Sequence, residues 1–317
     1  MKKTYLILSL VTFVLLLIII FLLLSRSQKV SPSEPNDLSA FDNFKNEVLQ
    51  SGKEYPVDCK SAQDPYECLD QYAIKNNDFE VCVFLPLKLL VDSCIRDSLE
   101  SHSIQDSKYC ELLDGTSKSL CYRFMAEINN DKALCLKTTS TDVCLRTIAF
   151  RLKKIEICNE IEDEITKLNC NAVLLENSAD CLKLEGKPAF WESDCLRNIA
   201  YLKKDSSICT LIKDKKYESW CFAGTSGDIS KCSGSGTFDN NWCIIETAVK
   251  FNKPDFCNSI DTSGFLTQDQ KNHCYALVNR DVTYCDQYLQ KAGIADCRKD
   301  VNLLKTNSNL IFSETMI

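Results

Sequence analysis

The stretch CLRTIAFRLKKIEIC, residues 144–158, recurs almost unchanged as CLRNIAYLKKDSSIC, residues 195–209. Both segments begin and end with a cysteine, and both keep the phrase C-L-R-x-I-A in the same place. A segment that recurs with its cysteines in register indicates an array of similar structural units. The other cysteines of the chain should therefore mark further copies of the unit.

Nine segments align on cysteines that lie 23 to 28 residues apart, a spacing typical of solenoid repeats. Nine positions before these cysteines, eight of the nine residues are alanine and the other is serine. Four positions before them, seven of the nine are aspartate or asparagine. The internal repetition is therefore secure. The aligned residues are Cys82, Cys110, Cys135, Cys158, Cys181, Cys209, Cys232, Cys257 and Cys285.

Each repeated position has a helical explanation. Aspartate and asparagine accept hydrogen bonds from the free N–H groups at a helix start, so they indicate N-caps. The alanine lies in the preceding helix, where a small side chain lets two helix backbones approach closely. The second cysteine of a unit mostly lies 14 or 11 positions before the aligned one. These two spacings differ by three residues, nearly one helical turn, so the sulfur stays on roughly the same face of the helix. We predict an all-α fold, a right-handed α-solenoid of hairpins of about 25 residues, each with a longer helix, a tight turn and a shorter helix.

The spacing also predicts which cysteines pair. Cys144 and Cys158 would be offset by roughly 9 Å along antiparallel helices, whereas a disulfide needs Cα atoms about 4.4–6.8 Å apart. Cys158 and Cys170 instead lie symmetrically about a polar centre near Asp163. Sequence alone does not fix connectivity, but this rule gives ten sequential bridges with no cysteine left over. They are Cys59–Cys68, Cys82–Cys94, Cys110–Cys121, Cys135–Cys144, Cys158–Cys170, Cys181–Cys195, Cys209–Cys221, Cys232–Cys243, Cys257–Cys274 and Cys285–Cys297.

The N-terminal residues predict a membrane anchor. Lys2 and Lys3 precede an apolar run, residues 5–24, that as a helix spans roughly 30 Å, the thickness of a hydrocarbon core. The alternative is a cleaved signal peptide, for which Ser25-Arg26-Ser27 is a weak cleavage site. All twenty cysteines follow this run, which places them in an oxidising, extracytoplasmic compartment. The expected organisation is a cytoplasmic N-terminus (1–4), a transmembrane signal anchor (5–24), a flexible linker (25–40), the cysteine-rich repeat domain (41–300) and a C-terminal cap or tail (301–317).

Several chemistries are disfavoured by what the sequence contains. The net charge of −7 argues against a nucleic-acid partner. Zinc sites usually draw cysteines from close pairs, but the closest cysteines here are nine positions apart. The two histidines, His102 and His273, lack a recognisable nucleophile and are expected at the surface or in turns. We therefore expect no catalytic residue, no cofactor, no metal and no enzymatic activity.

Three polar segments have structural interpretations. Gly224, Gly227, Gly234 and Gly236 fall within AGTSGDISKCSGSGT, which lacks a phosphate-loop motif and indicates a loose repeat or hinge. Basic runs such as 151–154 and 213–216 are expected to be solvated helix faces. The acidic residues 162–164 are expected in a solvated turn rather than in acid–base catalysis.

Six aromatic residues gather in one part of the array. They would suit a binding surface if exposed, because aromatic residues are enriched at interaction hot spots. The alternative is that they fill gaps between helices. The residues are Phe190, Trp191, Tyr217, Trp220, Phe222 and Trp242.

Tandem helical hairpins with a disulfide in each resemble the Sel1-like, cysteine-rich repeat proteins of bacterial envelopes, relatives of tetratricopeptide arrays. The resemblance is architectural and covers Cys59 to Cys297, in units shorter than the roughly 34 residues of a tetratricopeptide repeat. Since solenoids bind proteins or peptides across curved surfaces, we expect a membrane-anchored interaction, adhesion or envelope-scaffold module with a protein or peptide partner at the cell surface. Two alternatives stay open: a structural or protective surface protein without a specific ligand, and an enzyme with an unrecognised site.

Overall fold

The computed structural model describes residues 38–306, apart from 233–235, 265–266 and 291–292. The chain divides into two units, residues 1–39 and 40–317, and the second contains the repeats. The expected N-terminus (1–4), transmembrane anchor (5–24) and nearly all of the linker lie outside the described residues, as does the tail after residue 306. Among the helices that are described, none combines the length and the hydropathy needed to cross a bilayer.

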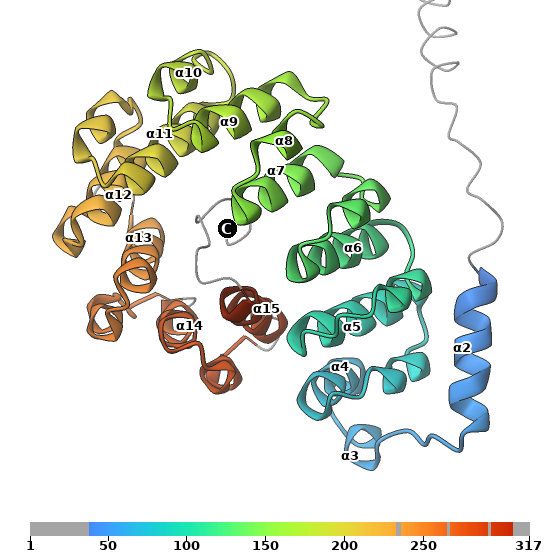
Figure 1. The fold of residues 1–317 in the computed structure, drawn as a ribbon. Helices are drawn as coiled ribbons and strands as arrows, with labels where there is room; N and C mark the ends of the chain where they lie inside the picture. Colours follow the sequence, from blue (N-terminus) through green and yellow to red (C-terminus); the bar gives the residue numbers. More distant parts are fainter. Residues whose placement is uncertain (1–37, 233–235, 265–266, 291–292, 307–317) are drawn as a thin grey trace, which may run out of the picture. The chain divides into compact units, whose positions relative to one another are not determined.

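The described residues form α-helices that alternate with short, mostly 3₁₀ helices, and none of these residues lies in a strand (Figure 1). The all-α prediction is therefore confirmed, whereas the handedness of the solenoid stays a prediction. The longer helices are α2 (Leu38–Gln50), α4 (Pro65–Asn76), α5 (Lys88–Ser101), α6 (Gly115–Asn129), α7 (Thr141–Leu152), α9 (Glu164–Leu174), α11 (Ala189–Lys203), α12 (Lys215–Ser226), α13 (Thr237–Phe251), α14 (Thr267–Asn279) and α15 (Gly293–Thr306). The short ones are α3 (Val57–Lys60), η1 (Phe79–Phe84), η2 (Ser107–Leu112), η3 (Lys132–Lys137), α8 (Ile155–Cys158), α10 (Ser178–Leu182), η4 (Ser206–Leu211), η5 (Ile229–Lys231), η6 (Pro254–Ser259) and η7 (Val282–Gln287).

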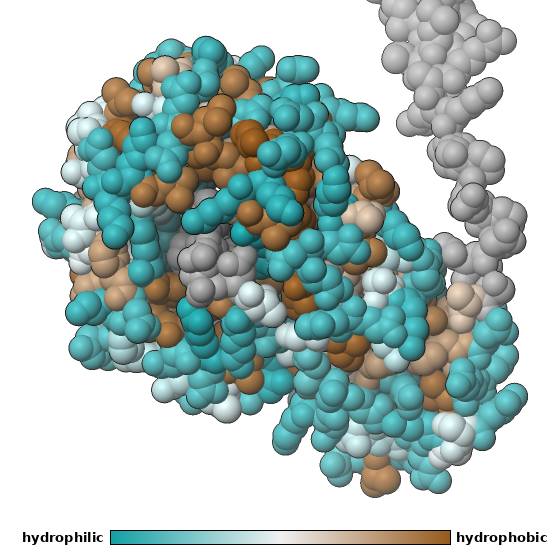
Figure 2. Space-filling model, in the orientation of Figure 1, coloured by the Kyte–Doolittle hydropathy of each residue, from teal (hydrophilic) through white to brown (hydrophobic). Residues whose placement is uncertain are grey.

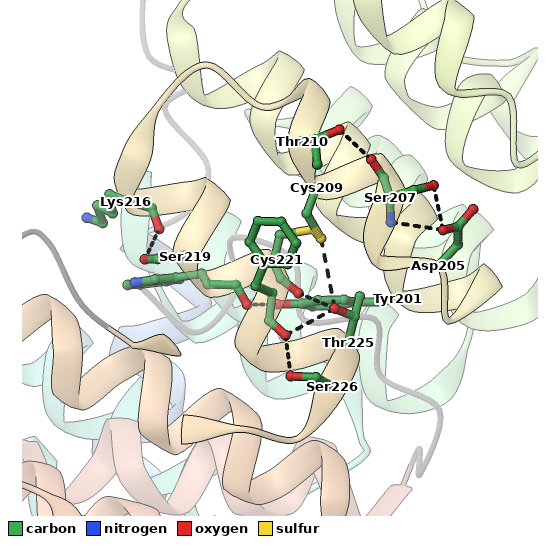
Figure 3. Close-up of a disulfide and its surroundings, with 12 residues drawn as sticks. Tyr201, Asp205, Ser207, Cys209, Thr210, Lys216, Ser219, Cys221, Thr225 and Ser226 are labelled. Atoms are coloured by element: carbon green, nitrogen blue, oxygen red, sulfur yellow. Dashed lines mark hydrogen bonds between the residues drawn. A yellow bond between two sulfur atoms is a disulfide. The ribbon is translucent and has the colours of Figure 1, made fainter. Parts of the chain in front are cut away.

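Each hairpin is a short helix joined by a disulfide to the long helix that follows it. Figure 3 shows one example, in which Cys209 of η4 bonds Cys221 of α12. The ten disulfides join the same sequential pairs that the spacing indicated, with Cα–Cα distances from 5.4 to 5.8 Å. They use all twenty cysteines and leave none free.

The recurring alanine and aspartate meet at the turn that ends a long helix, as they do after α11. The backbone N–H of Asp205 donates to the carbonyl of Ala200 at 3.0 Å, and Lys204 between them has a left-handed backbone, φ 53°. This is the arrangement that commonly closes a helix C-terminus. Asp205 then accepts the N–H of Ser207 at 2.9 Å, which caps η4 (Figure 3). One pair of residues thus ends one helix and starts the next.

The one unit without the alanine ends its helix differently. After α5 the closing bond runs from the N–H of Ile104 to the carbonyl of Leu99, at 3.2 Å. The turn has therefore moved two residues toward the N-terminus, and Ser101, which replaces the alanine, no longer accepts this bond. The other eight alanines of the pattern are all fully buried, as expected where helix backbones approach closely.

Polar side chains link each hairpin to the next. Asp142, two positions before Cys144, accepts the N–H groups of Glu162 and Asp163 at 3.1 and 2.8 Å. Those N–H groups belong to the loop between α8 and α9 in the following hairpin. Four other side chains accept a backbone N–H from the next hairpin in the same way, 20 to 22 positions later: Asp92, Ser119, Asn241 and Asp269. Sequence reasoning missed this set, although four of the five lie two positions before a cysteine of a long helix.

The last helix of the array packs against an early one. Figure 1 shows α15 lying against α5, and the side-chain amide of Asn302 donates to the carbonyl oxygens of Glu100 and Ser101 at 3.3 and 2.8 Å. Leu303 belongs to the core formed by the first hairpins, and Ile74 to the core formed by the last ones. Within residues 40–306 the array therefore closes on itself, which the sequence did not predict.

The first described helix, α2, packs against the first hairpins. Phe41 and Val48 are buried in the core of the first hairpins, and the ring of Phe44 stacks on Phe79 of η1 with centroids 6.0 Å apart. Leu49 faces solvent instead. At the other end, the expected boundary near residue 300 falls inside α15, where Val301–Leu304 are buried.

Candidate functional site

The six aromatic residues between Phe190 and Trp242 do not form one group. Trp220 is 3% exposed and fills a gap between helices, whereas Phe190 is 36% exposed. The ring of Phe190 lies 5.2 Å from that of Trp191, and Tyr217 lies 6.1 Å from Trp220. Trp242 contacts Phe238 and His273 instead. The half-buried members are Trp191, Tyr217, Phe222 and Trp242.

Two buried arginines make cation–π contacts with these aromatic rings. Arg146 and Arg197 follow Cys144 and Cys195 by two positions, so they are the arginines of the repeated C-L-R phrase. The guanidinium of Arg146, which is fully buried, lies 4.7 Å from the ring centroid of Trp191, and that of Arg197 lies 5.6 Å from Trp220. Cation–π contacts of this kind hold the rings in place. The signal that could have identified them is the recurrence of arginine in both copies of the phrase.

Arg197 lies in a buried ion cluster of α11 and α13. Its guanidinium lies 3.0 Å from a carboxylate oxygen of Asp194 and 3.2 Å from one of Glu246. Burial lowers the pKa of Arg197, but the charges of Glu246 and Asp194 outweigh it and raise the pKa overall. Burial, reinforced by Glu246, also raises the pKa of Tyr201, whose hydroxyl donates to the carbonyl of Trp220 at 3.0 Å. This cluster therefore keeps Arg197 charged and Tyr201 neutral.

Lys250 of α13 lies beside this cluster. Its Nζ is 3.3 Å from the centroid of the Tyr201 ring and has no hydrogen-bond acceptor among the described residues. Burial lowers the pKa of Lys250 to about 7, with Arg197 and Lys204 adding to the effect and Glu246 opposing it. At neutral pH the amine is therefore distributed between its charged and neutral forms.

Large apolar side chains are exposed where α9, α10 and α11 follow one another. Leu175 is 63% exposed, Leu182 39% and Phe190 36%. Figure 2 shows hydrophobic side chains gathered over this part of the molecule. We call Leu175, Leu182, Phe190 and the half-buried Trp191 the α9–α11 apolar group. Within this group Phe190 and Trp191 are in ring contact, and contiguous exposed apolar surface often marks an interaction site.

The expectation that both histidines lie at the surface or in turns is wrong for His273. His273 is 6% exposed within α14, where its Nδ1 lies 2.5 Å from the Tyr288 hydroxyl and its Nε2 3.3 Å from a carboxylate oxygen of Asp300. These contacts join α14 to the last hairpin. His102 follows the end of α5 and is half-buried, with Nδ1 3.0 Å from the Ser98 carbonyl. Sequence reasoning missed the partners of His273 because they are 15 and 27 positions away.

The glycine-rich segment is ordered helix and turn over its described part. Gly224 lies within α12, where a Cβ atom would meet the Tyr201 ring at 2.4 to 2.6 Å and its hydroxyl at 2.3 Å. Gly227 takes the left-handed position that ends α12, at φ 73°. Residues 224–232 form the end of α12, its turn and η5, while Gly234 lies outside the described residues, so the loose repeat or hinge stays a prediction.

The charged runs follow the expectation only in part. Asp163 caps α9 by accepting the N–H of Thr166 at 2.8 Å, which agrees with a solvated turn. Arg151 is buried, contrary to expectation, and its Nη1 donates to the carbonyl of Glu127. Within the described ranges, no group of three or more His, Cys, Asp or Glu side chains could hold a metal ion.

A cavity of about 820 Å³ lies between α4 and α15. Its walls carry both signs of charge, with Glu67 and Lys75 on α4 and Arg298 on α15. Arg298 forms an ion pair with Asp286 at 2.7 Å. No predicted site residue other than Cys68 lines this cavity.

Comparison with known proteins finds no match: no protein-family model, no curated protein and no solved structure matches this chain.

Proposed function

We propose that the repeat domain is an extracytoplasmic, non-enzymatic module that binds a protein or peptide and is held at a membrane by residues 5–24. Ten disulfides indicate an oxidising compartment, since such bonds are rare where thiols are kept reduced. Residues 5–24, inserted in the membrane as a helix, would keep the domain close to the membrane surface. Adhesion and envelope scaffolding are both forms of this role.

The α9–α11 apolar group carries the proposal. Phe190 exposes apolar surface in contact with the Trp191 ring, and covering such surface contributes roughly 25 cal/mol for each Å² of apolar area. The buried Arg146 under Trp191 holds one ring of the group in a fixed orientation. A preorganised aromatic side chain loses little entropy on binding, which suits a contact centre.

Site-specific photo-crosslinking on intact cells tests the proposal. A photoreactive phenylalanine is placed at Phe190 or at Leu182. Matched controls carry it at Leu136 or Leu289, which are 73% and 64% exposed on other hairpins. We expect discrete adducts from the first two positions and not from the controls.

The alternative of a structural or protective surface protein predicts a different result. Without a specific ligand, the four positions would give no adducts, or the same diffuse ones. An enzyme with an unrecognised site would give adducts that a small-molecule competitor removes. A finding that all four positions behave alike would contradict the proposed binding surface.

A further inference from the structure

The contact that closes the array differs from the contacts between successive hairpins. It joins α15 to α5 through Asn302, which donates to the carbonyl of a residue 202 positions earlier. The Nζ of Lys299 lies 3.5 Å from a carboxylate oxygen of Glu100 in the same contact. Leu303 adds an apolar side chain that is 2% exposed. We call this contact between α5 and α15 the seam.

The seam has no covalent support. Every disulfide joins cysteines 9 to 17 positions apart, so each lies within one hairpin. The last bridge, Cys285–Cys297, ties α15 to η7 and not to α5. Opening the array there would break hydrogen bonds, the Lys299–Glu100 ion pair and apolar packing, including that of α15 on α6 and of Ile74 on the last hairpins.

The seam is also polar and incompletely filled. A cavity of about 210 Å³ lies among α5, α6 and α15, large enough for several water molecules. Its lining includes Arg96 and Glu100 of α5 together with Asp296 and Lys299 of α15. Polar contacts between parts of one chain are typical of surfaces that can separate.

We propose that the seam is a pH-sensitive clasp, which opens and closes the repeat array while all ten disulfides stay intact. The opened form exposes the faces of α5 and α15 that the closed form covers. Acidification favours the closed form, and a rise in pH from about neutral favours the open one. The clasp does not depend on the α9–α11 apolar group, so it stands apart from the proposed function.

Glu100 gives the clasp its proton dependence. Its carboxyl is buried in the closed form, and burial raises its pKa to about 7, with Asp97 and Asp296 adding to the effect and Lys299 and Arg96 opposing it. Once the seam opens, water solvates the carboxyl and its pKa returns toward the ordinary value of about 4.3. Charged groups from three helices face Glu100: Arg96 and Asp97 on α5, Arg123 and Glu127 on α6, and Asp296 and Lys299 on α15. Asp70 of α4 lies beside Arg96 and Asp97.

The difference between the pKa values of Glu100 in the closed and open forms sets how the closed-to-open ratio changes with pH. The closed form binds a proton at Glu100 at pH 6, whereas the open form does not, so lowering the pH stabilises the closed form. With the carboxyl at a pKa of about 7 when closed, the ratio of closed to open molecules rises about tenfold between pH 8 and pH 6. Above pH 8 the carboxylate is ionised in both forms and this contribution vanishes.

Hydrogen exchange of the disulfide-intact chain, read by mass spectrometry, tests the clasp. The opening equilibrium of the α15 amides is compared at pH 6 and pH 8 after correction for intrinsic exchange rates. We expect the opening constant to be about tenfold larger at pH 8, with no comparable change in α9 of the central hairpins. Glu100→Gln, which imitates the protonated carboxyl, should keep α15 protected at both pH values.

Two further variants separate the clasp from general instability. Asn302→Ala removes the bonds to the carbonyl oxygens of Glu100 and Ser101, and should raise opening at both pH values while the tenfold pH response remains. Glu160→Gln, on an exposed ion pair with Lys132, should behave as the parent. A helical circular dichroism spectrum and exchange of the α9 amides that both match those of the parent show that each variant is folded. The clasp is overturned if α15 opening changes less than twofold with pH, or if Glu100→Gln keeps the full response.

Discussion

At the scale of single residues, the fold depends on a backbone conformation that most side chains disfavour. After most of the long helices the residue before the next helix's N-cap position is left-handed, and it is lysine at Lys153 and Lys204, glutamate at Glu176 and arginine at Arg280. The left-handed conformation costs a residue with a Cβ atom roughly 1 kcal/mol. The array therefore retains a small, removable strain at several helix ends.

Replacing Lys153 by glycine should stabilise the domain. Glycine takes φ 52° without steric cost, so Lys153→Gly should raise the free energy of unfolding by about 0.5–1 kcal/mol in urea denaturation of the oxidised protein. Lys154→Gly is the matched control, because the neighbouring residue has φ −111° and gains nothing. Equal effects of the two substitutions would show that the left-handed turn is not the cause.

Replacing Gly224 by alanine should destabilise the domain. The new Cβ would overlap the Tyr201 ring, and overpacking of this kind costs about 1–3 kcal/mol. Tyr201→Ala removes the obstacle, so the double variant should be less destabilised than the two single variants added together. Additive free energies of unfolding in the four-protein cycle would contradict the overlap.

At the scale of helices and turns, the sequence predicted what is local and missed what is not. The alanine and aspartate of each unit act within one turn, as with Ala200 and Asp205, so the repeat exposed them. The sequence did not show that most of the short helices are 3₁₀ helices, because the same capping residues begin both α-helices and 3₁₀ helices. The bond from Asp142 to the next hairpin was also missed, because it depends on how two units stack.

Asp142→Ala should weaken the joint between two hairpins. It leaves the N–H groups of Glu162 and Asp163 without their carboxylate acceptor, and lost hydrogen bonds to a charged group cost about 1.5–3 kcal/mol. Faster hydrogen exchange confined to residues 159–170 would reveal the loss. Asp180→Ala, on an exposed side chain contact within one hairpin, serves as the control; the same exchange pattern in both variants would contradict a specific joint.

The capping aspartates should make the fold sensitive to acid. The Ser207 hydroxyl and N–H lower the pKa of Asp205, and the Thr283 N–H and hydroxyl lower that of Asp281. A lowered pKa in the folded state means that the stabilisation is complete above about pH 4 and is lost as the pH falls through the folded values. The melting temperature should drop below pH 4, and Asp205→Asn with Asp281→Asn should flatten that drop. An unchanged acid slope would show that other carboxyls control it.

At the scale of the whole repeat domain, the order of the hairpins was predictable and their closure was not. Cysteine spacing reports contacts within a hairpin, as in Cys158–Cys170. The meeting of Leu303 with the first core depends on small rotations from each unit to the next, which accumulate over the whole array. Asn302 belongs to no motif, and Ser101 is the one departure from the repeated alanine, so no local pattern pairs the two residues.

Removing one central disulfide should destabilise the domain without disordering all of it. Cys158→Ala with Cys170→Ala opens a loop of 12 positions, which should cost roughly 2–4 kcal/mol. Urea denaturation measures the loss, and peptide mapping should still find the other nine bridges. If nine bridges are not retained, the hairpins are less independent than the local pairing indicates.

The strictly local pairing also bears on how the chain acquires its bonds. Each cysteine bonds the next one along the chain, as with Cys82 and Cys94 followed by Cys110 and Cys121. In a chain that enters an oxidising compartment from its N-terminus, the first thiol of a pair meets its correct partner before any later cysteine arrives. Vectorial oxidation would therefore yield the native set with an oxidase alone, whereas refolding the full-length reduced chain presents all twenty thiols at once and requires an isomerase to correct wrong pairs.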